Sequence, residues 1–113
     1  DVPCTRKLSA VEIGGEYEAA TGEVIVECVG KGDPLTQPAV LVASHGPFTW
    51  GRDVAEAVHN AEVLEFVARL AGETERLEPR VKRMQRVLLD KHFLRKHGPG
   101  AYYGQRRGAG RAV

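Results

Sequence analysis

His45 is the residue whose position favours chemistry most clearly. An apolar run, Ala39–Ala43, predicts a strand that is buried on both faces and that ends at a turn, Ser44–Pro47. The imidazole is therefore expected at the end of a sheet, where α/β proteins often bind ligands. A neutral imidazole there is a good zinc ligand, and a hydrogen-bonded turn histidine is the alternative. The pattern alone leaves both interpretations open.

No other residue completes a metal site by its spacing. The sequence holds no HxH, HExxH or CxxC pattern. His59 is expected to pack or to cap beside an apolar helix face. His92 and His97 lie five residues apart, which is a poor spacing for one helical face. If His45 binds a metal, the further ligands must come from elsewhere.

Three other residues have side chains that could support a reaction. Glu16 could act as a base or orient metal ligands, although a solvent-facing helical glutamate is the more common case. Arg95 lies in a basic segment, and its guanidinium suits a phosphate group. Tyr103 follows a turn at 98–100, and its phenol could either transfer a proton to a neighbouring site or anchor the chain. The residues alone favour the anchor.

Helices are expected on both sides of the His45 turn. Ser9 and Glu12 form a capping box that predicts a helix over 9–29, although Gly and β-branched residues weaken this interpretation. A second capping box and an apolar stripe predict a helix over 54–71. A third helix is expected from 79 to 97, with a Gly cap and basic residues at its C-terminal end.

The predicted strands are too few for an independent sheet. Pro3 favours an extended segment over 2–6, and a strand is expected to resume at Phe48–Trp50 after the turn. The resulting order is short strand, helix, strand or hairpin, helix, helix, which is an α/β pattern. Because one or two short strands do not make a stable sheet, we expect part of a larger domain, or a subunit whose sheet another chain completes.

Composition narrows the class of protein. The chain has 113 residues, of which 42% are hydrophobic and 27% charged, so one globular domain at most is expected. No apolar stretch approaches the roughly 20 residues of a membrane span, and no signal peptide is recognisable. Cys4 and Cys28 are too few for a disulfide scaffold, which makes the cytoplasm the expected location. A Walker loop, a GxGxxG motif and a nucleophile elbow are absent from the sequence.

Charge is distributed unevenly along the chain. Residues 1–79 carry 6 Lys/Arg and 14 Asp/Glu, a net charge of −8. Residues 80–113 carry 10 Lys/Arg and one acid, a net charge of +9. A basic segment can bind nucleic acid, an acidic partner or a phosphorylated substrate, or it can be a solvated helix face. The solvated face is the favoured interpretation, and binding of nucleic acid is the least expected.

Six stretches of the sequence, in unbroken order, resemble the L-ribulose-5-phosphate 4-epimerases of the class II aldolase and epimerase family. They are EIGGEYE at 12–18, TGEVIVE at 21–27, SHGPFTWG at 44–51, DVAEAVHN at 53–60, LLDKHFLRKHG at 88–98 and AYYGQ at 101–105. Related aldolases that act on fuculose or rhamnulose phosphate share the fold and a metal-binding histidine. The AYYGQ ending is not expected in them.

The resemblance implies a fold and an activity. The fold would be the C-terminal part of a three-layer α/β/α sandwich with a mainly antiparallel central sheet, and the assembly a homotetramer. The family interconverts the sugar phosphates L-ribulose 5-phosphate and D-xylulose 5-phosphate by zinc-dependent retro-aldol and aldol steps. No membrane partner is implied.

The resemblance also implies roles for single residues. His45 matches a zinc ligand, and Tyr103 matches a tyrosine that acts as acid and base from an adjacent subunit. Glu16, His92 and Arg95 match positions that support the site or the subunit contact.

The family's chain is about twice as long as this sequence. Residues 1–105 would therefore be a partial domain without its N-terminal half, and 106–113 a flexible Gly/Arg-rich tail. Because the other zinc ligands belong to that half, we expect this chain to be inactive alone. The alternative is a non-catalytic half-domain that assembles with an intact subunit or binds nucleic acid.

Overall fold

The computed structural model describes residues 2–102 of the chain and comprises two compact units, Asp1–Leu77 and Glu78–Val113. The first unit contains α1 (Ala10–Gly14), α2 (Tyr17–Val29), the short 3-10 helix η1 (Pro34–Thr36), β1 (Ala39–Val42), β2 (Gly46–Thr49) and α3 (Val54–Leu77). The second contains α4 (Arg86–His97).

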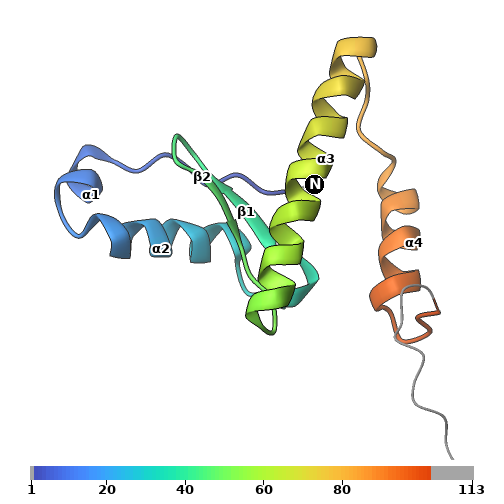
Figure 1. The fold of residues 1–113 in the computed structure, drawn as a ribbon, viewed down its shortest axis with the longest axis horizontal. Helices are drawn as coiled ribbons and strands as arrows, with labels where there is room; N and C mark the ends of the chain where they lie inside the picture. Colours follow the sequence, from blue (N-terminus) through green and yellow to red (C-terminus); the bar gives the residue numbers. More distant parts are fainter. Residues whose placement is uncertain (1, 103–113) are drawn as a thin grey trace, which may run out of the picture. The chain divides into compact units, whose positions relative to one another are not determined.

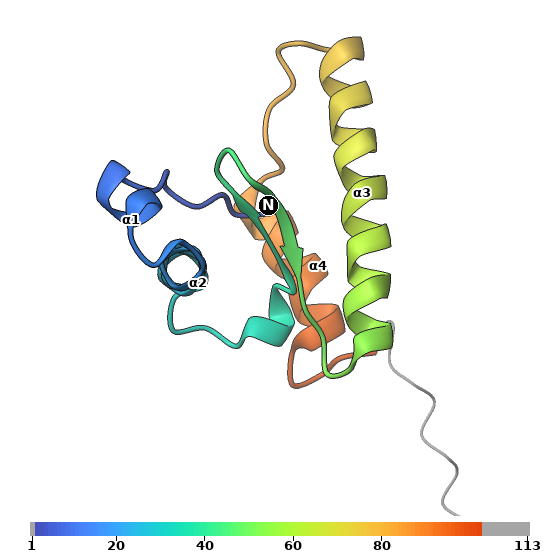
Figure 2. The ribbon, with the colours of Figure 1, turned by 60° about the vertical axis from the view of Figure 1, so that its left-hand side comes forward.

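The first unit has three layers. The β1–β2 hairpin lies between α2 and α3, and α2 packs on β1 while α3 contacts both strands (Figures 1 and 2). This order of layers, helix on hairpin on helix, places a helix on each face of the strands. Within the described residues, no helix combines the length and apolar character that crossing a bilayer requires.

The hairpin is antiparallel, and Val40 lies opposite Phe48. On the other edge of β1, the amide of Thr5 donates to the carbonyl of Leu41 at 2.9 Å, and the amide of Leu41 donates to the carbonyl of Pro3 at 2.9 Å. These two bonds confirm the extended segment expected over residues 2–6. Because Leu41 makes these bonds, its peptide groups point away from β2. Its partner Pro47 therefore points its own backbone groups to the outer edge of the hairpin, where the missing N–H of proline breaks no bond between β1 and β2.

The core of the first unit lies between α2 and β1. Val24 and Val40 are fully buried there. The sequence predicted that the strand at 39–43 is buried on both faces, and this is wrong. Leu41 is 39% exposed because its side chain points toward α3, which covers that face only in part. The strand therefore alternates between a buried face and a half-covered one.

The helix predicted over 9–29 is broken. The capping box at its start is confirmed, since the Glu12 amide donates to Ser9 Oγ at 3.3 Å and the Ser9 amide donates to Glu12 Oε2 at 2.7 Å. The first helix nevertheless ends at Gly14, and Gly15 has φ −102° and ψ −133°, outside the helical region. Helix formation costs more free energy at glycine than at any residue except proline, so the pair Gly14 and Gly15 favours a break. The chain becomes helical again at Tyr17, the first residue of α2.

The start of α3 is defined by a side-chain cap at Asp53 and a close backbone approach at Gly51. Asp53 Oδ1 accepts a hydrogen bond from the Glu56 amide at 2.8 Å, which confirms the predicted cap. Before it, a Cβ on Gly51 would lie 2.7 Å from Glu56 Cβ and 2.8 Å from the Ala57 nitrogen, so only glycine fits this close approach. The helix continues to Leu77, beyond the predicted end at residue 71.

The second unit is built on α4, which begins later than the predicted residue 79. The Glu78 carbonyl accepts from the Val81 amide at 2.9 Å in a single turn that does not continue as a helix, and α4 starts at Arg86. The predicted glycine cap is confirmed, because the Gly98 amide donates to the Leu94 carbonyl at 2.7 Å.

Candidate functional site

His45 lies in the turn that joins β1 to β2, and its side chain is exposed. The turn is fixed by two backbone features. The His45 amide donates to the Val42 carbonyl at 3.0 Å, and Ser44 adopts a left-handed conformation with φ 62°. A serine in this region is uncommon and carries some strain. The imidazole is thus presented at the end of the hairpin, as the sequence predicted.

Two aromatic rings lie beside the imidazole. The ring of Tyr17, the first residue of α2, is stacked on the His45 ring with 6.4 Å between centroids and 29° between planes. The Phe48 ring lies 5.3 Å from the imidazole centroid and is tilted by 41°. The start of α2 and the hairpin turn therefore meet at His45.

Glu16 precedes Tyr17 at this same end of α2. Its backbone has φ −79° and ψ 74°, and its exposed side chain makes no capping hydrogen bond. A carboxylate beside the first turn of a helix is favourably placed in the field of the helix dipole. Glu16 is adjacent to Tyr17 in the sequence, and His45 contacts the Tyr17 ring, so both predicted site residues lie next to Tyr17.

The other predicted site residues belong to the second unit. His92 is exposed on α4, and Arg95 is half-buried in its last turn. The Arg95 carbonyl accepts from the Tyr102 amide at 3.0 Å, so the chain after the helix folds back on this residue. Tyr103, predicted as the acid and base, lies outside the described residues.

The described residues do not complete a metal site. Within 2–102, no three His, Cys, Asp or Glu side chains are grouped closely enough to hold an ion. The His45 imidazole makes no hydrogen bond with any residue of that part, so its lone pair is open to an external ligand. A catalytic zinc takes three protein ligands, and the described part offers one.

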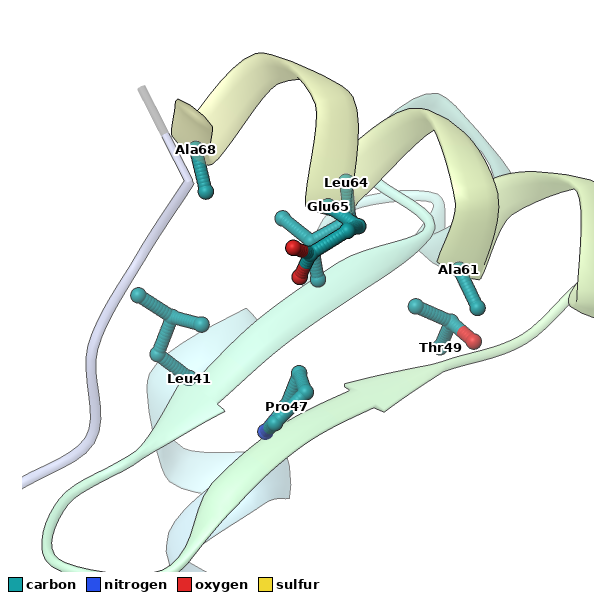
Figure 3. Close-up of a pocket in the computed structure, with 7 residues that line it drawn as sticks. All are labelled: Leu41, Pro47, Thr49, Ala61, Leu64, Glu65 and Ala68. Atoms are coloured by element: carbon teal, nitrogen blue, oxygen red, sulfur yellow. The ribbon is translucent and has the colours of Figure 1, made fainter. Parts of the chain in front are cut away.

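Two hollows of the first unit do not include His45 in their lining. A groove of about 250 Å³ runs between the hairpin and α3 (Figure 3). Its lining is apolar except for Thr49 and Glu65; the lining residues are Leu41, Pro47, Thr49, Ala61, Leu64, Glu65 and Ala68. A second apolar hollow, of about 400 Å³, lies between Trp50 and Val26. Neither offers the convergent polar groups of a catalytic pocket.

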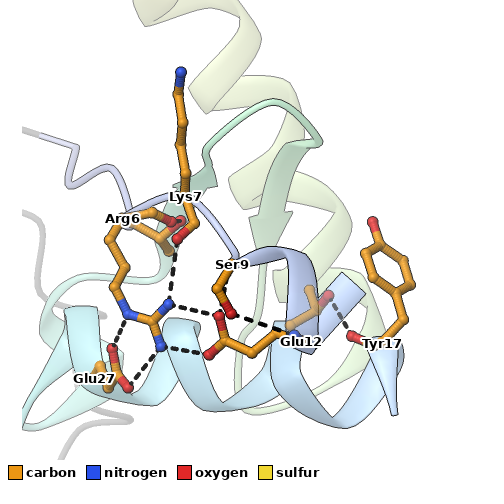
Figure 4. Close-up of polar contacts among 8 residues, drawn as sticks. Arg6, Lys7, Ser9, Glu12, Tyr17 and Glu27 are labelled. Carbon is orange, nitrogen blue, oxygen red and sulfur yellow. Dashed lines mark hydrogen bonds and ion pairs between the residues drawn. The ribbon is translucent and has the colours of Figure 1, made fainter. Parts of the chain in front are cut away.

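A polar cluster that the sequence did not indicate braces the start of the chain. The Arg6 guanidinium donates to both carboxylate oxygens of Glu12, at 3.0 and 2.8 Å, and to both of Glu27, at 2.9 and 3.1 Å (Figure 4). The hydrogen bonds from Arg6 and from Ser9 lower the pKa of Glu12 from 4.5 to about 2. The two carboxylates raise the pKa of Arg6 further above its ordinary value. The cluster joins α1 to α2 and holds no group that points at His45.

Sequence reasoning missed the contact between Tyr17 and His45. The sequence carries no local signal for this contact, because only the fold brings residue 17 to residue 45. An aromatic residue at the first position of a helix predicts a core contact as readily as a site contact.

A comparison with known protein families identifies the domain that carries this candidate site. A family model described as Class II Aldolase and Adducin N-terminal domain matches residues 1–71, which is more than half of the chain and includes His45 and Glu16. The mixed helices and the antiparallel hairpin are those of a partial α/β fold of the class II aldolase type. The chain therefore belongs to the class II aldolase and adducin family.

Proposed function

We propose that this chain forms part of a sugar-phosphate epimerase that interconverts L-ribulose 5-phosphate and D-xylulose 5-phosphate. The observation that carries the proposal is the exposed His45 at the hairpin turn, within the region that matches the class II aldolase family. Among the reactions of that family, the six stretches that resemble L-ribulose-5-phosphate 4-epimerases favour epimerisation at C4.

The reaction has two balanced halves. The C3–C4 bond of the ketose phosphate breaks as the C4 hydroxyl loses its proton, which gives an enediolate and an aldehyde. The aldehyde rotates, and the enediolate carbon adds to its other face while the new alkoxide regains a proton. A bound zinc ion would supply Lewis-acid stabilisation of the enediolate.

The residues of this chain have distinct parts in the proposal. His45 offers an imidazole lone pair as one metal ligand, and the remaining ligands come from outside the described residues. Glu16 offers a carboxylate at the same end of α2, to accept a proton or to orient a ligand. The Arg95 guanidinium suits the substrate phosphate, and His92 supports the site from the same helix. Tyr103 is the proposed proton carrier.

Assembly is part of the same proposal. Since Tyr103 is expected to act in the site of an adjacent subunit, activity requires a homo-oligomer, which we propose to be a tetramer in the cytoplasm. Exposed apolar side chains on α3, among them Phe66 at 61% and Leu70 at 52%, are compatible with burial in such an assembly. Light scattering on the protein purified from its own cells measures the subunit number.

The activity test uses the tagged chain, recovered from its own cells with whatever subunits it assembles. We expect this material to convert L-ribulose 5-phosphate to D-xylulose 5-phosphate, to lose the activity on chelation and to regain it with Zn²⁺. His45→Asn should abolish turnover. The matched control is His59→Asn, which changes an exposed histidine on α3, away from the hairpin turn. This variant should retain the activity.

Three results would overturn the proposal. One is full activity in the His45→Asn assembly, and another is activity that chelation leaves unchanged. The third is release of the aldehyde without the epimeric product, which would mark an aldolase. The purified 113-residue chain with Zn²⁺ is expected to show no turnover by itself.

A further inference from the structure

The strongest additional feature of the candidate site is the stacked pair formed by Tyr17 and His45. We propose that Tyr17 is a positioning residue, which holds the His45 imidazole in one orientation at the end of the hairpin. The metal-binding consequence of this proposal rests on the proposed function. The orientation itself is a property of this chain and is measurable without a metal.

The imidazole needs such a restraint. Histidines that bind metals are usually oriented by a hydrogen bond from the second ring nitrogen to a carboxylate or a carbonyl. Among the described residues, His45 has no such bond, and the contacts that fix its ring are those with Tyr17 and Phe48. An exposed histidine in a turn would otherwise exchange between rotamers within nanoseconds.

Tyr17 is itself firmly held. Its amide donates to the Gly15 carbonyl at 3.0 Å, and its carbonyl accepts from the Thr21 hydroxyl at 2.8 Å. Thr21 is buried, with 6% of its surface exposed, in the face of α2 that packs on β1. The phenol ring is therefore attached to a fixed helix end, and it can transmit that rigidity to a ring stacked on it.

The other side of the contact is equally constrained. The His45 amide is bonded to Val42 within the turn, and Phe48 continues into β2 opposite the buried Val40. Both backbones that carry the stacked rings are thus anchored in the same core. Ring contacts of this kind favour the stacked arrangement roughly three- to tenfold over an open one.

The test is nuclear magnetic resonance on the full chain with uniform isotope labelling, in the absence of metal, so that both the histidine rings and the backbone of α2 are observed. The His45 ring signals are assigned by their loss in His45→Asn. Tyr17→Leu should shift these signals and increase the motion of the ring, because the stacked face is gone. Tyr17→Phe keeps the ring and should leave the signals near those of the wild type. Tyr102→Leu, at an exposed tyrosine of the second unit, is the control for a lost phenol.

Circular dichroism identifies which variants are folded. If Tyr17→Leu does not fold, Tyr17→Met replaces it, because the flexible methionine side chain can fill the same space and still lacks the ring. Unchanged His45 signals and motion in a folded Tyr17→Leu chain would overturn the positioning role. A loss of order confined to His45 would support it, whereas a merely structural role would move signals throughout α2.

Zinc added alone to the labelled chain separates this inference from the proposed function. If Zn²⁺ selectively perturbs the His45 ring, and its affinity falls roughly three- to tenfold in Tyr17→Leu, the result supports both the positioning role of Tyr17 and the proposed function. Perturbation of all four histidines alike counts against His45 as the metal ligand of the proposed function. The metal-free measurement still decides whether Tyr17 orients the ring.

Discussion

The side-chain amide of Asn60 donates a hydrogen bond of 2.8 Å to the backbone carbonyl of Trp50. The bond joins the early part of α3 to the residue that follows β2. Trp50 also donates through its own amide to the Pro38 carbonyl at 3.2 Å, and through its indole Nε1 to the Pro34 carbonyl at 2.9 Å. Trp50 thus connects α3, the hairpin and η1 at the end opposite the His45 turn.

Asn60→Ala is expected to destabilise the chain by about 1 kcal/mol, because the part-buried Trp50 carbonyl loses its partner. Urea unfolding followed by circular dichroism measures the free energy. His59→Ala, at the neighbouring exposed position, is the control and should change the free energy by less than about 0.5 kcal/mol. Equal losses in the two variants would show that the bond contributes nothing specific.

Val40→Ala is expected to cost about 2 kcal/mol, since this side chain is fully buried between β1 and α2 and its removal leaves a cavity. Val26→Ala is the matched change on α2, where the side chain is 70% exposed and the cost should be near zero. The comparison is made by urea unfolding. A small effect at Val40 would contradict a core centred on this strand.

Glycine at position 51 is expected to be indispensable. Gly51→Ala brings a methyl group within 3 Å of the backbone and side chain at the start of α3, and should cost about 1–3 kcal/mol. Gly72 lies within α3, and a Cβ there would meet open space. Gly72→Ala should therefore stabilise α3 by about 0.5–1 kcal/mol. Thermal unfolding should therefore shift in opposite directions for the two alanine variants, and a shift in the same direction would refute the steric argument.

The pair of Arg6 and Glu12 predicts a defined acid sensitivity. Because the pKa of Glu12 is lowered to about 2 in the folded chain, its stabilising contribution is complete above pH 4.5. The contribution is then lost as the pH falls through about 2. Glu12→Gln should reduce stability at neutral pH and flatten the dependence between pH 4.5 and 2. Unfolding by urea at a series of pH values measures this.

Glu23→Gln provides the control for that experiment. It removes one exposed carboxylate from α2 and leaves the bonds between Arg6 and Glu12 intact. The acid-side loss should therefore persist in this variant. A profile as flat as that of Glu12→Gln would mean that the loss reflects total charge and not the ion pair.

The features that sequence predicted correctly are local ones. The capping box formed by Ser9 with Glu12 is present, as are the Asp53 side-chain cap on the Glu56 amide and the glycine cap at Gly98. Each depends on groups within four residues of one another, so that local chemistry alone selects the conformation. The hairpin turn with its exposed histidine belongs to the same class.

The features that sequence could not predict depend on distant partners. Arg6 reaches Glu27 on a different element, and Tyr17 reaches His45, so neither contact has a local signature. The partial exposure of Leu41 follows from how much of the hairpin α3 covers, which periodicity does not report. The break at Gly15 is a local event, but the apolar spacing on both sides of it favoured a continuous helix.

Pro47 has a consequence for how this chain behaves at high concentration. Residues 47 and 49 direct their peptide groups outward from β2, and the proline leaves Thr49 as the one amide donor of that strand available on the outer edge. An extended segment approaching from outside finds too few donors to form a continuous ladder. The outer edge of β2 is thereby a poor template for the edge-to-edge growth that leads to fibrils.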